Sequence, residues 1–280
     1  MEAGLIEMLN DICGKDIFNA IFETLTINLF SDAGEYASVL DIVRELHNSV
    51  VRPLALMLLF IYFTISLIDK ASQENFTWEQ FWRQLLLLIT SKFIIEHGFE
   101  ILQLLFDVGM AFAADIQAWT GYNGDEAGDV ANAKNIIASF KAGLGLTGWL
   151  STIGDLVMYV FLLIPWLISW VMRLCVSIIC YSRVIEIYAR AALAPVAMAD
   201  FFHTGTQGNG WRSLKNFLAV CLQGGTILII AVIFSALLNQ ISANDQNLFT
   251  FIGKYLAFFA SAIMLMFKSL SFTKEMIGTN

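Results

Sequence analysis

Charged residues are scarce in this chain of 280 residues. They make up 14% of it, whereas about 25% is usual for a soluble domain. Hydrophobic residues make up 58%, and the mean hydropathy is +0.68. This composition excludes a disordered chain, which could not bury enough apolar surface, and it excludes an ordinary soluble domain. It predicts an integral membrane protein.

The chain also lacks the residue patterns of most enzymes and metal proteins. Its four cysteines include no C-x-x-C pair, so neither a disulfide framework nor a zinc site is expected. The three histidines lie far apart, and no H-E-x-x-H motif occurs. The glycines of 143–148 match G-x-G-x-x-G without the context of a dinucleotide site, and those of 205–210 do not form a phosphate-binding loop. We predict no catalytic residue, no cofactor site and no metal site.

Long hydrophobic stretches are what the chain has instead. A membrane-spanning helix requires about 20 mostly apolar residues. One of the stretches that meet this length carries Arg173 as its single charge and Pro165 as a predicted kink. The four predicted spans cover residues 50–68, 156–181, 217–238 and 249–267.

A further apolar stretch, residues 85–112, is interrupted by charges. On one continuous helix, its polar side chains at spacings of 4, 4, 3 and 4 would lie within an arc of about 80°. This predicts either a span whose polar stripe faces protein or a wet path, or an amphipathic helix in the membrane interface. Two members of the stripe, Lys92 and Glu96, are four residues apart, which suits an ion pair on a helix. The stripe consists of Lys92, Glu96, Glu100, Gln103 and Asp107.

The predicted fold is all-α: a polytopic membrane protein with about five transmembrane helices. Amphipathic helices are expected before the first span, because apolar residues repeat with helical spacing in 17–29 and 39–50. The predicted regions in order are an acidic external region (1–49), the first two membrane helices (50–113), an external central loop (114–155), a long third helix with a cytoplasmic projection and an Ala/Pro-rich motif (156–225), and the last two membrane helices with the C-terminus (217–280).

The distribution of charge predicts the orientation. The first 48 residues carry nine acids against two bases, a net charge of −7, and lack the basic region of a cleavable signal peptide. With five spans, one side of the membrane holds five Lys and Arg and the other holds eight. Because cytoplasmic loops are enriched in these residues, the N-terminus is predicted outside and the C-terminus in the cytoplasm.

Residues 181–225 hold the most informative pattern. A third helix running from 156 to 188 would be about 50 Å long, which leaves about 20 Å outside the hydrocarbon core. That projection would carry Arg183, Glu186 and Arg190 on one face, with Glu186 placed for an ion pair to Arg190. Because proline interrupts a helix, Pro195 would end the long helix, and residues 191–202 are predicted to form a separate short helix.

The residues of this region resemble those of the TrbL-like polytopic inner-membrane subunits of conjugative type IV secretion machines, with the Gram-positive conjugal-transfer branch the most similar. The resemblance implies a channel scaffold that moves DNA with its relaxase, forms homo-oligomers, and works with other channel subunits and separate secretion ATPases within membrane lipid. It implies no catalytic residue. The residues that carry it, and that we expect to serve docking or assembly, are Arg183, Glu186, Arg190, Pro195, Asp200, Ser213, Lys215 and Gln223.

A small-solute transporter is the alternative interpretation. It would use the break at Pro195 and the polar stripe as a binding site, and it would need two related halves with paired broken helices. Only one such break is visible in the sequence. A membrane-embedded hydrolase would need a positioned acid and base, which the scattered histidines do not supply.

Overall fold

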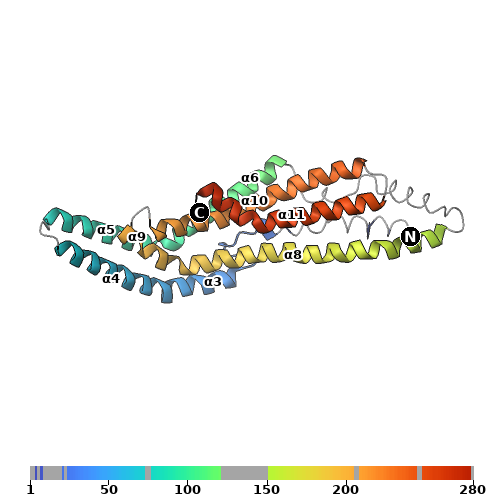
Figure 1. Ribbon diagram of the computed structural model, residues 1–280. Helices are drawn as coiled ribbons and strands as arrows, with labels where there is room; N and C mark the ends of the chain where they lie inside the picture. Colours follow the sequence, from blue (N-terminus) through green and yellow to red (C-terminus); the bar gives the residue numbers. More distant parts are fainter. Residues whose placement is uncertain are drawn as a thin grey trace. The chain divides into compact units, whose positions relative to one another are not determined.

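The computed structural model describes residues 4, 7–8, 21, 24–72, 77–120, 151–204, 208–244 and 248–278, and all regular structure among them is helical (Figure 1). The predicted all-α class is therefore confirmed. The elements are α3 (Ala37–Leu46), the π-helix η1 (His47–Val51), α4 (Arg52–Ala71), α5 (Trp78–Glu96), α6 (Gly98–Thr120), α8 (Ser151–Ala199), α9 (Phe201–Thr204), α10 (Asn209–Asn244) and α11 (Leu248–Ile277).

Among the described residues, four helical runs are long and apolar enough to cross a membrane. Each contains all or most of one predicted span, so the chain is a polytopic helical membrane protein. Pro53 lies in the first turn of α4, directly after the π-helix η1, within the continuous helical run Ala37–Ala71. Neither α5 nor α6 is among the four runs, which are Ala37–Ala71, Leu162–Ala199, Asn209–Leu237 and Ile252–Ile277.

The stretch 85–112 is two helices, so the prediction of one continuous helix is wrong. Helix α5 ends at Glu96, His97 leaves the helical region with ψ 14°, and α6 starts at Gly98. Glycine is a poor helix former, and a Cβ on Gly98 would lie 2.8 Å from the Met198 sulfur. The polar stripe is consequently divided between two helices.

Helix α8 runs without interruption for 49 residues, or about 74 Å, through both Pro165 and Pro195. The predicted separate helix at 191–202 is therefore wrong. The reason is tertiary packing. Side chains on one side of the last turns of α8, including Val184, Ile187 and Ala191, are buried in the core of the surrounding helices. For the same reason this part of α8 is not a free projection.

The chain divides into two compact units, each with its own apolar core. Unit 1 comprises 1–26, 113–181 and 224–269, and its core includes an aromatic cluster of Phe234, Tyr255 and Phe259 with ring centroids 5.4 to 6.4 Å apart. Unit 2 comprises 27–112, 182–223 and 270–280. The division into regions along the sequence concerns membrane topology and stays a prediction.

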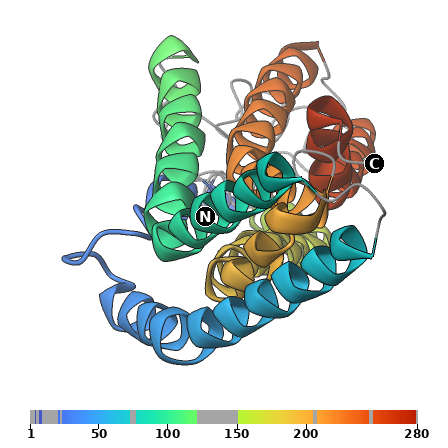
Figure 2. The same cartoon turned by 90° about the vertical axis from the view of Figure 1, so that its left-hand side faces the viewer.

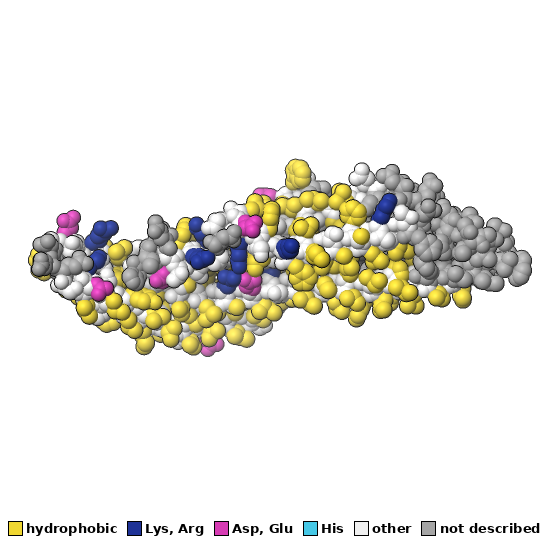
Figure 3. Space-filling model, in the orientation of Figure 1, with side chains coloured by type: hydrophobic (Ala, Val, Ile, Leu, Met, Phe, Trp, Pro, Cys, Tyr) yellow, Lys and Arg dark blue, Asp and Glu magenta, His cyan; other side chains and the backbone are white. Residues whose placement is uncertain are grey.

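Within unit 2, α4 and α5 form a helical hairpin, and α9 packs against both (Figures 1 and 2). Large apolar side chains of α4 are exposed, including Met57, Phe60 and Ile68. Side chains of this kind cover the α4 surface seen in Figure 3. A surface of this composition suits lipid rather than water.

Candidate functional site

Arg183 of α8 is buried inside unit 2 and bonded to α10. Only 3% of its surface is exposed. Its Nε donates to the carbonyl of Val220 at 3.2 Å and its Nη2 to the carbonyl of Cys221 at 3.1 Å. A buried cation is costly unless such partners compensate its lost hydration. Arg183 therefore fastens α8 to one place on α10.

Helix α6 reaches the same place through a glycine. A Cβ added to Gly109 would lie 2.8 Å from the carbonyl carbon, the oxygen and the Cβ of Cys221. Only glycine permits this approach of α6 to α10, as small residues do at helix contacts in membranes. Gly109, Arg183 and Cys221 together form a three-helix junction.

A second contact compensates for the proline in α8. Pro195 has no N–H, so the carbonyl of Ala191, four residues earlier, lacks its helical donor. The Nδ1 of the buried His47 lies 2.9 Å from that carbonyl oxygen. Since a carbonyl can only accept, Nδ1 carries the proton. This hydrogen bond explains how α8 continues through Pro195. It also holds η1 against α8.

Tyr188 makes a third contact of this type. Its hydroxyl donates to the carbonyl of Leu29 at 2.7 Å, across 159 positions of sequence. The ring of Phe30 lies 6.4 Å from that of Tyr188. The segment before α3 is thereby held against α8.

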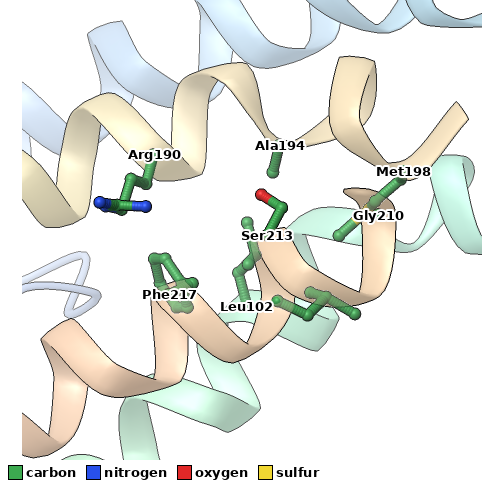
Figure 4. A pocket seen from close by; sticks show the side chains of 8 residues that line it. Leu102, Arg190, Ala194, Met198, Gly210, Ser213 and Phe217 are labelled. Atoms are coloured by element: carbon green, nitrogen blue, oxygen red, sulfur yellow. The ribbon is translucent and has the colours of Figure 1, made fainter. Parts of the chain in front are cut away.

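Glu186 and Arg190 form the predicted ion pair. The Nε and Nη2 of Arg190 both bond the same carboxylate oxygen, at 2.9 and 2.6 Å. Arg190 also lines a small pocket, in which it and Ala194 on α8 face Ser213 and Phe217 on α10 (Figure 4). The pocket offers about 10 Å³ to the centre of a water molecule, which is room for a single water. It is too small for a substrate.

The remaining predicted assembly residues lie in the connection to α10 or on α10. Asp200 accepts the backbone N–H of Asn209 at 2.8 Å and so caps the start of α10. The Lys215 ammonium lies 6.0 Å from the centre of the Trp211 ring. Gln223 and Pro195 are both buried. Seven of the eight residues thus lie on α8 or α10 of unit 2, and Asp200 lies in the connection between these helices.

Three residues of the divided stripe, Lys92, Glu96 and Glu100, form ion pairs or charged contacts. On α5, the Glu96 carboxylate lies 3.7 Å from the Lys92 ammonium, which confirms the spacing argument, and 3.6 Å from Arg52 of α4. On α6, Glu100 contacts His97 at 3.0 Å and is mostly exposed. Gln103 is half-buried and Asp107 is exposed. These residues are divided between α5 and α6, and the face that they present to protein, lipid or water stays a prediction.

The contacts described above position helices against one another. Within the described ranges, no group of three or more His, Cys, Asp or Glu side chains is placed to hold a metal ion. Both features that suggested a transporter, a break at Pro195 and a continuous stripe, are absent from the described helices. What the site does is fix α8 against α10, η1 and the segment before α3.

Sequence reasoning missed His47, Tyr188, Arg52 and Gly109. A signal existed for His47, because a proline inside a helix leaves a carbonyl that needs a donor, and histidine is one of few candidates in an apolar chain. No signal identified the partners of the other three, since pattern and spacing describe one helix at a time.

The family model described as TrbL/VirB6 plasmid conjugal transfer like protein matches residues 33–195, which is more than half of the chain. The matched region includes Arg183, Glu186, Arg190 and Pro195, and ends before Asp200 and the α10 residues. No curated protein and no solved structure matches the chain.

Proposed function

Since the chain belongs to the TrbL/VirB6-like plasmid conjugal transfer family and is therefore a component of a conjugative type IV secretion machine, we propose that it is a channel or scaffold subunit that helps to pass DNA with its relaxase across the cell membrane. The observation that carries this proposal is the three-helix junction at Arg183. The buried Arg183 guanidinium bonds backbone carbonyls of α10 and so fixes the register of α8 against α10. A scaffold subunit needs its long helices held in a fixed arrangement of this kind.

The proposal includes partners and assembly. Five membrane helices are too few to enclose a passage for DNA, so several copies of the chain would surround it. Energy would come from separate ATPases, and the chain itself would not be an enzyme. The expected partners are these ATPases and the other channel subunits, in the inner or cytoplasmic membrane.

A topology with the N-terminus outside and the C-terminus in the cytoplasm belongs to the same proposal. It needs five crossings, of which residues 85–112 would supply the second. Reporters fused after Asn48, Asn132 and Asn244 test it: the first two should report an external position and the third an external loop between α10 and α11. A cytoplasmic signal at Asn132 would contradict the second crossing.

Conjugation from the native element tests the function. Deletion of the gene should abolish transfer, and the wild-type chain supplied in trans should restore it. Formaldehyde crosslinking during transfer, followed by immunoprecipitation of the chain, should recover the transferred strand. Normal transfer without the chain contradicts the proposal entirely, whereas dependence on the chain without any crosslink contradicts its place beside the DNA.

Two variants connect this assay to the junction. Arg183→Ala should lower the frequency of transconjugants and the recovery of oligomer from detergent extracts, because α8 loses its attachment to α10. Arg212→Ala removes an exposed arginine from α10 and should leave both unchanged. Equal transfer by the two variants would exclude a role of the junction.

A further inference from the structure

A second cavity in unit 2, with a volume of about 400 Å³, lies between the last turns of α4, the first turns of α5, and α9. Its volume falls in the range of small-molecule sites. None of the residues that line it belongs to the junction at Arg183 or to the predicted assembly residues. The family match and the proposed role in transfer leave this cavity without a function.

Two cationic side chains, Lys70 of α4 and Arg83 of α5, line the cavity. Neither forms an ion pair with any residue of the described ranges. Asp69 is the third charged residue among the described lining residues, which together carry a formal charge of +1. The cavity is therefore suited to a ligand with one negative charge.

A buried amide adds a neutral donor. Gln84 of α5 is only 4% exposed, yet it lines the cavity. Its Oε1 accepts the hydroxyl of Ser66 at 3.0 Å. Its amide nitrogen has no hydrogen-bond partner among the described residues. A donor in the lining of a cavity is available to an acceptor on a ligand or to water.

The rest of the lining is apolar. Phe202 of α9 is buried and is held by an edge-to-face contact with Phe63 of α4, at 5.8 Å between ring centroids. Ile65 and Leu87 are exposed on the lining. Cations next to apolar walls fit an amphiphile better than a fully polar anion.

The cavity also lies at the end of a membrane helix. The run Ala37–Ala71, which ends beside it, can span a bilayer. Trp78 and Trp82 on the adjoining turns of α5 are 78% and 57% exposed, as is typical of the level of the headgroups. In Figure 3, Lys or Arg side chains and acidic side chains both lie at this end of α4 and α5, next to the apolar surface of α4.

We propose that this cavity binds an anionic phospholipid whose headgroup carries hydroxyls. Lys70 and Arg83 bind its phosphate, the Gln84 amide donates to a phosphate or ester oxygen, and Asp69 accepts a headgroup hydroxyl. An acyl chain follows Ile65 and Leu87 onto the exposed surface of the hairpin. Basic pockets between membrane helices bind anionic headgroups in this way. The proposal does not depend on DNA transfer.

Native mass spectrometry of the full chain in detergent tests the proposal. The delipidated protein is titrated with dioleoylphosphatidylglycerol and, separately, with dioleoylphosphatidylcholine. One phosphatidylglycerol should bind well before further lipids, and phosphatidylcholine should not bind as a discrete single species. Equal binding of the two lipids would overturn the proposal.

Two sets of variants locate the site. Lys70→Gln with Arg83→Gln should weaken the first phosphatidylglycerol by about 30-fold, since each cation near a membrane surface contributes about a factor of five. The control, Arg212→Gln with Lys268→Gln, removes the same charge from exposed positions away from the cavity and should bind as the wild type does. Binding unaffected by the first pair would place the lipid elsewhere.

A third variant covers the case in which the double variant does not fold. Gln84→Glu keeps the shape and the bond from Ser66, and it adds a negative charge that should weaken phosphatidylglycerol binding. Unchanged binding would argue against the cavity.

Competition identifies the source of the phosphate. Inorganic phosphate and glycerol 3-phosphate should displace the lipid only at far higher concentration, and Leu87→Gln should weaken the lipid without affecting either of them. Displacement by inorganic phosphate at equal concentration would mean a soluble anion site and would overturn the lipid proposal.

Discussion

The two units bury different polar side chains. Among the described residues, unit 1 buries the side chains of Ser169, Ser235 and Ser269, as well as the hydroxyl of Tyr255 and the Nε of Arg173. Unit 2 buries His47, Gln84 and Arg183 as well as smaller polar residues. A serine hydroxyl can bond a carbonyl of its own helix, as Ser269 does with Met266 at 2.6 Å. Arginine and histidine reach across to another helix, as they do here.

This difference teaches where specificity lies in an apolar chain. In a membrane, apolar packing does not distinguish a helix from lipid strongly, so contacts between small residues and interhelical hydrogen bonds decide which helices meet. Unit 2 has both kinds of contact, in Gly109 and in the bonds of Arg183, His47 and Tyr188. In unit 1, the rings of Phe234, Tyr255 and Phe259 pack against one another.

The largest expected effect is at Arg183. Arg183→Ala should lower the free energy of unfolding in mixed micelles by about 3 kcal/mol, because two charge-assisted bonds are lost and a cavity is left. Unfolding by SDS titration measures it. Arg212→Ala, at an exposed position of α10, should change it by less than about 0.5 kcal/mol. Similar values for the two would mean that the junction does not stabilise unit 2.

Glycines give the sharpest comparison of the units. Gly109→Ala should destabilise by about 2 kcal/mol, because its methyl group collides with the backbone of Cys221. Gly253 in unit 1 has nothing within 4 Å of an added Cβ, so Gly253→Ala should stabilise α11 by about 0.5 kcal/mol through helix propensity. Opposite shifts of the melting temperature in detergent are expected. Shifts of the same sign would refute the difference in packing.

The bond of Tyr188 should contribute less. Tyr188→Phe removes only the hydroxyl that donates to the Leu29 carbonyl and should cost about 1 kcal/mol. Hydrogen exchange of the amides of residues 29–36 should quicken if this bond holds the segment. Unchanged exchange together with unchanged stability would show that packing of the ring alone is sufficient.

The smallest effect is expected in unit 1. Ser261 is exposed, and its hydroxyl bonds the carbonyl of Ala257 in its own helix at 2.8 Å. Ser261→Ala should therefore change the free energy of unfolding by less than about 0.5 kcal/mol in the same titration. A loss as large as that of Tyr188→Phe would remove the distinction between bonds within a helix and bonds between helices.

What the sequence could predict was local. Hydropathy identified the four helical runs, and spacing identified the pairs Glu186 with Arg190 and Lys92 with Glu96, because both depend on residues within one or two turns. The bond from Arg183 to α10 depends on which helices meet, which periodicity does not contain. The turn at His97 and the continuity through Pro195 were missed because tertiary contacts at Gly98 and Ala191 override local propensity.

The proline in α8 makes two distant positions thermodynamically dependent on each other. If Pro195 is replaced by alanine, the new backbone N–H can donate the helical hydrogen bond to the carbonyl of Ala191. The His47 imidazole then competes for an oxygen that already accepts a hydrogen bond. The loss caused by His47→Leu should then shrink in the Pro195→Ala background, so that a double-mutant cycle has a coupling energy different from zero. Homologous chains with another residue at one of these positions should be free to change the other, and an alignment could use this covariation to pair η1 with α8.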